Sequence, residues 1–330
     1  MVNIQNNTLA IKRKKTRLLS LFLAAFFTAS MFSAVPTASA GSTEFTVPTT
    51  NARPFDVAKG PDGAVWFTSW NASKIGRIAT DGTITEFSTG SVRAMQIVAA
   101  PDGNLWFTAS PNKIGKMTPS GTVTTYSYTA GSYNTVDATG QLIVGPDGNL
   151  WFNAHYSIGK ADISSGTISL YTVSRNTNSI TTGPDGNLWF TTYGGYFGSM
   201  TTSGTVASSL SSGSNFTDIT TGPDGNMWAT SDETNDAIVK ITTASATTKY
   251  VLPTTTGGPR NITVGPDGAL WFTEQASSKI GRITAAGTIT EYDTPTASAE
   301  PWGITAGSDG NMWYSEYADG VNKIVRKALY

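Results

Sequence analysis

Two glutamates and one arginine are the candidate metal-binding or ion-pairing side chains of this sequence. Glu274 and Glu316 each stand three residues after a tryptophan, and Arg260 precedes the first of them. Two carboxylates can bind Mg²⁺ or Ca²⁺, or they can form ion pairs with a guanidinium. We therefore hypothesise a divalent metal site at Glu274 and Glu316. Alternatively, Arg260 lies beside them and keeps both carboxylates ionised and poorly basic.

Histidine is the residue best suited to exchange protons near neutral pH, and the chain has one. His155 follows Trp151 by four residues, and we interpret it as a surface or loop residue. The chain has no cysteine, so its stability comes from packing rather than from disulfides.

A Pro-Asp-Gly tripeptide recurs along the chain and marks the repeats that contain these side chains. Its aspartates, the last of them in a Ser-Asp-Gly variant, are Asp62, Asp102, Asp147, Asp185, Asp224, Asp267 and Asp309. Four residues after these stand Trp66, Trp106, Trp151, Trp189, Trp228, Trp271 and Trp313. Asp-Gly is favoured in hairpin turns, so we interpret the aspartates as structural rather than as metal ligands. The chain is therefore a sevenfold repeat.

Each repeat contains four short runs rich in Ile, Val, Thr and aromatic residues. In the sixth repeat these runs are residues 261–264, 269–273, 279–284 and 288–292, with Gly or Asp-Gly between them. Such runs predict four antiparallel strands joined by hairpins, which is one propeller blade. The sequence therefore predicts an all-β, seven-bladed β-propeller over residues 41–330.

The two ends of the repeat region predict how the ring closes. Residues 43–48 match the fourth strand of a repeat, whereas residues 322–327 match the third. The N-terminal strand can therefore complete the last blade. An open solenoid would need polar caps at its ends, and neither end has one.

The first forty residues have the pattern of a secretory signal peptide. Lys12 to Arg17 carry five positive charges, an apolar stretch follows to Val35, and Ala38-Ser39-Ala40 gives a small-residue cleavage pattern. An uncleaved membrane anchor is the alternative. We expect cleavage after residue 40 and a secreted, extracellular product with no membrane span.

Removal of this leader changes the net charge. The chain has 22 basic and 23 acidic residues, of which the leader holds five basic ones, so the remainder has 17 against 23 and a net charge of −6. This balance argues against nucleic acid or an anionic membrane as a partner.

The sixth repeat carries a recognisable phrase. Residues 265–292 read G-P-D-G-x-L-W-F-T-E…K-I-G-R-I-T…G-x-I-T-E-Y, which resembles the repeat of the virginiamycin B lyases and, more broadly, NHL-like propellers. The resemblance implies a lyase that opens the ester of a cyclic depsipeptide by elimination. It also implies two histidines, one as general base, a glutamate and bound Mg²⁺; Glu316 is the residue we match to that glutamate.

The positions that match the family's two histidines are occupied by other residues. They fall in the phrases Gly-Pro-Arg-Asn-Ile and Glu-Pro-Trp-Gly-Ile, where Arg260 and Trp302 stand in their place. Arginine stays protonated at biological pH and tryptophan has no basic site, so neither can act as the base. The glutamate three residues after the tryptophan is usual in the family repeat, so Glu274 and Glu316 are alternatively only repeat residues.

The position that matches the family's histidines lies seven residues before each repeat aspartate. The resemblance implies that this position faces a ligand cleft at one end of the channel. The seven residues there are Phe55, Met95, Gly140, Asn178, Thr217, Arg260 and Trp302. Trp302, Phe55 and Met95 come from consecutive blades, so we predict an apolar arc with Arg260 beside it. Such a surface suits an aromatic, anionic or sugar-like ligand; the alternative is that these residues plug the channel.

We therefore predict a secreted, monomeric propeller that binds a small molecule, peptide or glycan at its channel mouth and has lost the lyase bases. One alternative is a C–O lyase that opens a streptogramin B or a lactone with another base. A second is a divalent-metal lactonase that uses Glu274, Glu316 and Asn178. Whether the protein is an enzyme stays open at this point.

Overall fold

The computed structural model describes residues 41–129, 141–207 and 210–329. The predicted signal peptide, residues 1–40, lies outside the described residues. Within the described ranges every regular element is a β-strand, and no helix is long and apolar enough to cross a membrane.

The first four blades are consecutive four-stranded antiparallel sheets. Blade 1 comprises β2 (Pro54–Lys59), β3 (Val65–Ser69), β4 (Lys74–Ile78) and β5 (Ile84–Ser88). Blade 2 comprises β6 (Arg93–Ala99), β7 (Leu105–Ser110), β8 (Lys113–Met117) and β9 (Val123–Ser127). Blade 3 comprises β10 (Leu142–Val144), β11 (Leu150–Ala154), β12 (Ser157–Ala161) and β13 (Ile168–Thr172). Blade 4 comprises β14 (Thr177–Thr182), β15 (Leu188–Thr192), β16 (Tyr196–Met200) and β17 (Leu210–Ser211).

The last three blades follow the same plan, except that the seventh takes its outer strand from the start of the described chain. Blade 5 comprises β18 (Phe216–Thr221), β19 (Met227–Ser231), β20 (Ala237–Ile241) and β21 (Thr247–Val251). Blade 6 comprises β22 (Pro259–Val264), β23 (Leu270–Glu274), β24 (Lys279–Ile283) and β25 (Ile289–Asp293). Blade 7 comprises β26 (Pro301–Ala306), β27 (Met312–Glu316), β28 (Lys323–Lys327) and β1 (Ser42–Thr46).

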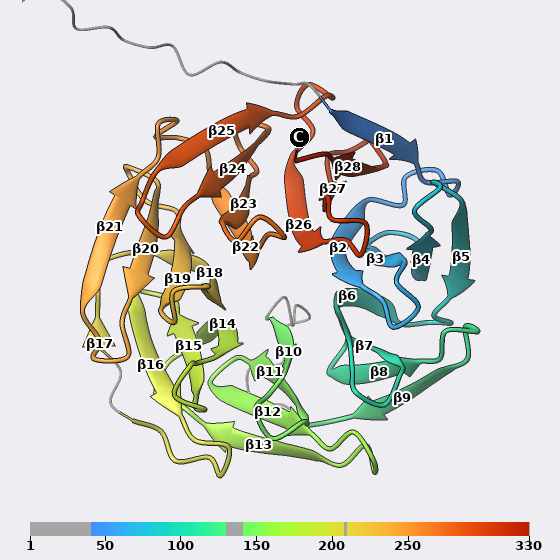
Figure 1. The fold of residues 1–330 in the computed structure, drawn as a ribbon. Coiled ribbons are helices and arrows are strands. Elements are labelled where there is room, and N and C mark those ends of the chain that lie inside the picture. Colours follow the sequence, from blue (N-terminus) through green and yellow to red (C-terminus); the bar gives the residue numbers. More distant parts are fainter. Residues whose placement is uncertain (1–40, 130–140, 208–209, 330) are drawn as a thin grey trace, which may run out of the picture. The chain divides into compact units, whose positions relative to one another are not determined.

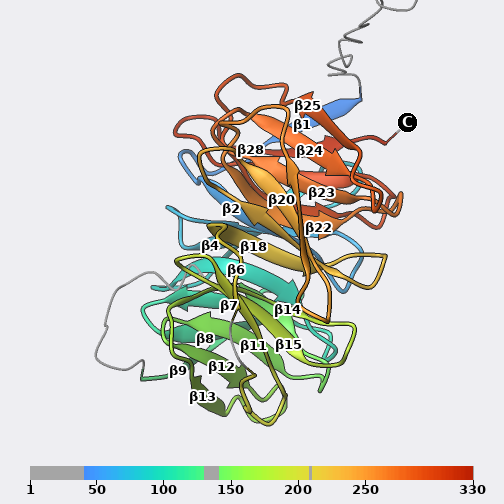
Figure 2. The ribbon, with the colours of Figure 1, turned by 90° about the vertical axis from the view of Figure 1, so that its left-hand side faces the viewer.

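The seven sheets stand in a ring, with the first strand of each blade nearest the axis and the fourth at the rim (Figure 1). In the view turned by 90°, the green strands of blades 2 and 3 lie at the bottom and the orange and red strands of blades 6 and 7 at the top (Figure 2). The predicted all-β, seven-bladed propeller is therefore confirmed.

The ring closes through β1, as predicted. β1 pairs antiparallel with β28, from Ser42 opposite Lys327 to Thr46 opposite Lys323. The contact also involves side chains, because the ring of Phe45 stacks on that of Trp313 at a centroid distance of 5.5 Å. Strands from the two ends of the described chain thus form one blade.

The Asp-to-Trp spacing of four residues has a direct structural cause. The repeat aspartate accepts a hydrogen bond from the indole Nε1–H of the tryptophan, at 3.0 Å between Trp66 and Asp62. The same bond occurs in all seven repeats. Gly60, two residues before Asp62, lets this indole approach, since a Cβ atom there would lie 2.2 Å from it. Five of the repeat aspartates also pair with a Lys or Arg of the third strand, as Asp147 does with Lys160 at 2.7 Å.

The hydrophobic core lies mainly between neighbouring blades. Each repeat tryptophan is buried and stacks on an aromatic ring of its own blade, as Trp66 does on Phe87. Apolar residues on the blade faces pack against the neighbouring blade. The aspartates are structural, as the turn chemistry predicts.

Candidate functional site at the channel mouth

A β-bulge in the inner strands determines which residues face the channel. In β2 the pairing with β3 shifts register between Pro54 and Val57, and β6, β22 and β26 shift at corresponding places. The hydroxyl of Thr68 holds this bulge, because it accepts the N–H of Asp56 at 3.1 Å and donates to the carbonyl of Met95 at 2.6 Å. Thr273 and Ser315 donate in the same way to the next blade.

In blades 4, 5 and 6, two successive residues of the inner strand line the channel mouth. A mouth cavity of about 210 Å³ lies at this level. It is lined by Gln96, Gln141, Asn178, Ser179, Tyr193, Asn215, Phe216, Thr217, Asp218, Arg260, Asn261 and Trp302. Arg260 and Trp302 thus share one cavity, as predicted from the sequence, whereas Phe55 and Met95 are not among its lining residues.

Phe55 and Met95 are core residues in this structure. Phe55 is 2% exposed, and its ring lies 5.0 Å from that of Trp302 between centroids. Met95 is fully buried. Phe55 therefore supports Trp302 from within, and Met95 has no surface that a ligand could contact. Ligand binding by Arg260 and Trp302 stays a prediction, whereas the burial of Phe55 and Met95 does not fit a direct ligand contact.

Two further aromatic residues join Trp302 and Phe55. Trp70, which follows β3, lies 5.0 Å from Phe55 between ring centroids. Tyr317, which follows β27, lies 5.5 Å from both Phe55 and Trp302. We call Phe55, Trp70, Trp302 and Tyr317 the mouth cluster. Sequence reasoning missed Trp70, although Trp70 and Trp302 are the two tryptophans outside the repeat position.

Three arginines stand over the mouth cluster. The guanidinium carbon of Arg53 lies 4.0 Å from the ring centroid of Tyr317, and that of Arg93 lies 5.0 Å from Trp70. Arg260 lies 5.6 Å from Trp302. These distances are those of cation–π contacts. The mouth therefore combines aromatic rings with positive charge.

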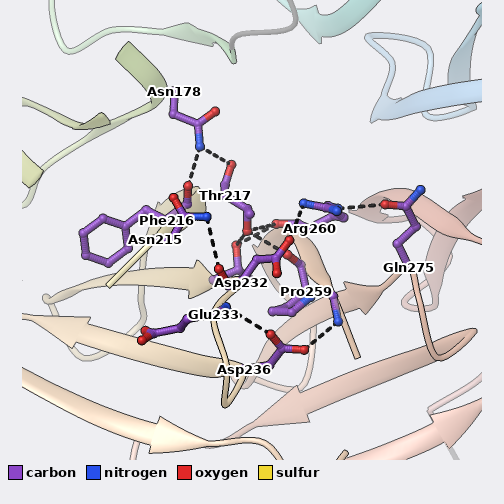
Figure 3. Close-up of polar contacts among 12 residues, drawn as sticks. Asn178, Asn215, Phe216, Thr217, Asp232, Glu233, Asp236, Pro259, Arg260 and Gln275 are labelled. Carbon is purple, nitrogen blue, oxygen red and sulfur yellow. Dashed lines mark hydrogen bonds and ion pairs between the residues drawn. The ribbon is translucent and has the colours of Figure 1, made fainter. Parts of the chain in front are cut away.

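Arg260 is fixed by polar partners on two loops (Figure 3). Its Nη1 pairs with Asp232 at 3.0 Å, and its Nε–H donates to Gln275 at 2.8 Å. Asp236 accepts the N–H of Gly258 at 2.7 Å and so positions the segment that enters β22. The Arg260 side chain is nevertheless 30% exposed, so part of its guanidinium can meet a ligand.

Glu274 and Glu316 lie in the protein interior. Both are fully buried. Burial, with a smaller contribution from the charge of Glu291, raises the pKa of Glu274 to about 8. Burial also raises the pKa of Glu316 to about 7, and the neighbouring Thr296 lowers this pKa by a smaller amount.

The expectation that Arg260 keeps these glutamates ionised is wrong. Arg260 pairs with Asp232 and Gln275 instead, and both glutamates have raised pKa values because burial disfavours their charged forms. Within residues 41–129, 141–207 and 210–329, no group of three or more His, Asp or Glu side chains is placed to hold a metal ion. Glu274 and Glu316 are therefore not part of a cluster of three or more such side chains that could hold Mg²⁺. Metal binding by the two glutamates stays a prediction.

His155 lies in the turn between β11 and β12. Its backbone carbonyl accepts the N–H of Thr177 at 2.8 Å, and it is not one of the residues that line the mouth cavity. Asp218 is the carboxylate in that lining. Burial raises the pKa of Asp218 to about 6, but its oxygens already accept four hydrogen bonds, so it is poorly placed to take a proton from a ligand.

The repeat region matches the model of the virginiamycin B lyase family over residues 25–139 and 134–328. The chain belongs to this family. No curated protein sequence matches it significantly.

Solved structures of this family have the same fold. Virginiamycin B lyase from Staphylococcus aureus is 31% identical, with a TM-score of 0.78 over 88% of this chain and 99% of that one. A streptogramin B lyase is 32% identical, with a TM-score of 0.79 over 88% and 97% of the two chains. A catalytically inactive histidine-to-alanine variant of the S. aureus enzyme, solved with quinupristin, is 31% identical, with a TM-score of 0.78 over 88% and 99%.

Proposed function

We propose that this virginiamycin B lyase family member binds an aromatic or sugar-ring ligand at its channel mouth and does not open streptogramin B. The observation that carries the proposal is the position of Arg260 and Trp302. They lie where the family's histidines are expected, share one cavity, and are in cation–π contact.

The chemistry of the mouth supports binding. Trp302 presents a planar face for stacking, and Arg260 adds a fixed charge that remains partly exposed. Asn178, Asn215 and Thr217 add amide and hydroxyl groups to the same cavity. Such a mixture of rings and a few polar groups is typical of small-molecule and peptide sites.

The same cavity lacks the means for elimination. That reaction needs a base that accepts a proton near neutral pH, and no histidine is among the residues that line the cavity. In the S. aureus enzyme, the exchange of one histidine for alanine gives a catalytically inactive protein. Glu274 and Glu316 have pKa values in a suitable range, but both are fully buried.

Quinupristin is the probe that tests this proposal, because the inactive lyase variant was solved with it. The protein is titrated with quinupristin and Mg²⁺ while tryptophan fluorescence is followed, and the products are analysed by mass and chromatography. We expect saturable binding and an intact ester. Trp302→Ala and Arg260→Ala should each weaken binding, whereas Tyr156→Ala, which removes an exposed ring from the β11–β12 turn, should not.

Two results would contradict the proposal. Ring opening without uptake of water would establish the lyase alternative and make the protein an enzyme. Binding that persists unchanged in Trp302→Ala and Arg260→Ala would place the ligand elsewhere.

We further propose that the protein acts outside the cytoplasm, because the charged, apolar and small-residue segments of residues 12–40 have the order of a signal peptide. N-terminal sequencing of the protein from culture medium should give Gly41 as the first residue. Intact Met1 in a membrane fraction would instead indicate an anchor.

A further inference from the structure

Four polar side chains line one level of the central channel. Gln96, Gln141, Asp218 and Asn261 line both the mouth cavity and a second cavity of about 300 Å³. Each stands six residues before a repeat aspartate, so they come from corresponding points of four repeats. We call these four residues the channel waist.

A second carboxylate lies next to the waist. Asp56 occupies the same repeat position in blade 1, lines the second cavity, and is 7% exposed. Its Oδ2 accepts the N–H of Ile97, the residue after Gln96, at 2.8 Å. Burial, with a smaller contribution from the charge of Asp218, raises the pKa of Asp56 to about 7. The carboxylates of Asp56 and Asp218 therefore line the same cavity.

Gln96 supplies an independent observation. It is 4% exposed and lines both cavities, yet its side-chain amide makes no hydrogen bond to any residue in the described part of the chain. Its backbone N–H is satisfied by the hydroxyl of Thr108. The amide atoms of Gln96 are not among the fully buried side-chain atoms that lack a partner, so they open into the cavity, where a polar occupant can bind them.

We propose that the channel waist binds a hydrated divalent cation of the calcium type. The ligands are the carboxylate of Asp56 and the amide oxygens of Gln96 and Gln141, completed by water. Ca²⁺ favours such oxygen ligands in irregular sites. The oxygens of Asp218 are already used by Ser179, Asn261 and two backbone N–H groups, so Asp218 contributes charge rather than a direct ligand.

The positive side chains that line these cavities leave the charge of the waist largely uncompensated. Arg260, in the mouth cavity, is paired with Asp232. Lys59, in the second cavity, is exposed to solvent. The cation site adjoins the mouth cavity, because Gln96 and Gln141 line both cavities, but it does not use Arg260 or Trp302 and does not depend on the proposed function.

Calorimetry with CaCl₂ on the metal-free protein tests the site, with MgCl₂ as a second probe. We expect one Ca²⁺ per chain, a higher thermal midpoint, and weaker binding of Mg²⁺, which dehydrates reluctantly. Asp56→Asn and Gln96→Leu should each weaken Ca²⁺ binding by about tenfold or more. Asn at position 56 keeps an acceptor for Ile97, and Gln96 has no hydrogen bond from its amide to lose, so both variants should fold.

Asp319→Asn, which changes a carboxylate whose side chain is 84% exposed, is the matched control and should keep the wild-type affinity. Glu316→Gln tests the alternative metal site at the glutamates. A wild-type protein that gives neither heat nor a shift in thermal midpoint overturns the proposal. So does wild-type affinity in Asp56→Asn, or loss of binding in Glu316→Gln, which would place the metal at the glutamates. Tighter binding of Mg²⁺ than of Ca²⁺ would contradict the proposed ligand chemistry.

Discussion

Phe45 and Trp313 come from strands at opposite ends of the described chain, yet their rings stack 5.5 Å apart with an interplanar angle of 18°. Phe87 stacks on Trp66 in blade 1 with nearly the same geometry, at 5.4 Å and 20°. The two pairs differ in what they connect. Phe87 and Trp66 belong to one continuous blade, whereas Phe45 and Trp313 hold the ring closed.

This difference predicts unequal effects of the same substitution. Phe45→Ala and Phe87→Ala each remove a stacked ring, which we expect to cost about 2–3 kcal/mol of unfolding free energy. Phe45→Ala should cost more, because a weakened β1 exposes the edge of β28 and the face of blade 7. Urea denaturation of both variants measures the difference. Equal losses would show that ring closure adds nothing to the stacking.

The repeat aspartates should stabilise the protein through their turns. Asp147 accepts the indole N–H of Trp151 at 2.9 Å and pairs with Lys160 at 2.7 Å. We expect Asp147→Ala to lower the unfolding free energy by about 1–3 kcal/mol, and Asp147→Asn to cost less because it keeps an acceptor. Denaturation of the two variants at neutral pH tests this. An equal loss in the two variants would mean that the ion pair with Lys160 carries the effect, because both variants lose it and the Asn variant alone keeps an acceptor for the indole N–H.

The pKa of Asp147 gives this prediction a pH dependence. Although partial burial opposes the change, Lys160 and Trp151 lower the pKa to about 2 from an ordinary value of 3.8. A depressed pKa stabilises the folded state above pH 3.8, and this contribution is lost as the pH falls toward 2. The difference between wild type and Asp147→Asn should therefore shrink in that range.

Glu316 should behave in the opposite way. Its pKa rises from 4.5 to about 7 on folding, mainly through burial. The folded state then binds more protons than the unfolded state between these values, so stability falls as the pH rises from about 4.5 to about 7. We expect Glu316→Gln to raise the unfolding free energy at pH 8 by about 2 kcal/mol and to change it little at pH 4.

Thermal unfolding across this pH range measures the effect. Asp319→Asn, which changes a carboxylate whose side chain is 84% exposed, serves as the control and should show no such pH dependence. A gain in stability from Glu316→Gln that is the same at both pH values would indicate a change in packing rather than relief of a buried charge.

Ser179 should matter most when Asp218 is ionised. Its hydroxyl donates to the Asp218 carboxylate at 2.6 Å. Burial raises the pKa of Asp218 from 3.8 to about 6, so the carboxylate is charged above that pH and needs its donors. We expect Ser179→Ala to cost about 1–2 kcal/mol at pH 8 and clearly less at pH 4. Equal losses at the two pH values would rule out an effect through the charge of Asp218.

Much of the candidate site depends on features that a repeat pattern does not encode. The position seven residues before each repeat aspartate was expected at the channel, and Arg260 and Trp302 do line the mouth cavity. The bulge in the inner strands adds the next position, which supplies Gln96 and Asp218. Such a shift of register depends on hydroxyl contacts with the neighbouring blade, which alternation along a single strand cannot show.

The seven blades and the four strands in each can be predicted from the sequence because Asp-Gly turns, the Asp62–Trp66 type of contact and strand periodicity all act within about ten residues. The closing strand is predictable for another reason, since residues 43–48 match the fourth strand of a repeat and residues 322–327 match the third. The burial of Phe55 and Met95, the contacts of Trp70 and Tyr317 with the mouth cluster, and the burial of Glu274 and Glu316 are visible in the folded molecule but not in the repeat pattern. Burial and charge at those positions are set by contacts between blades and loops distant in sequence.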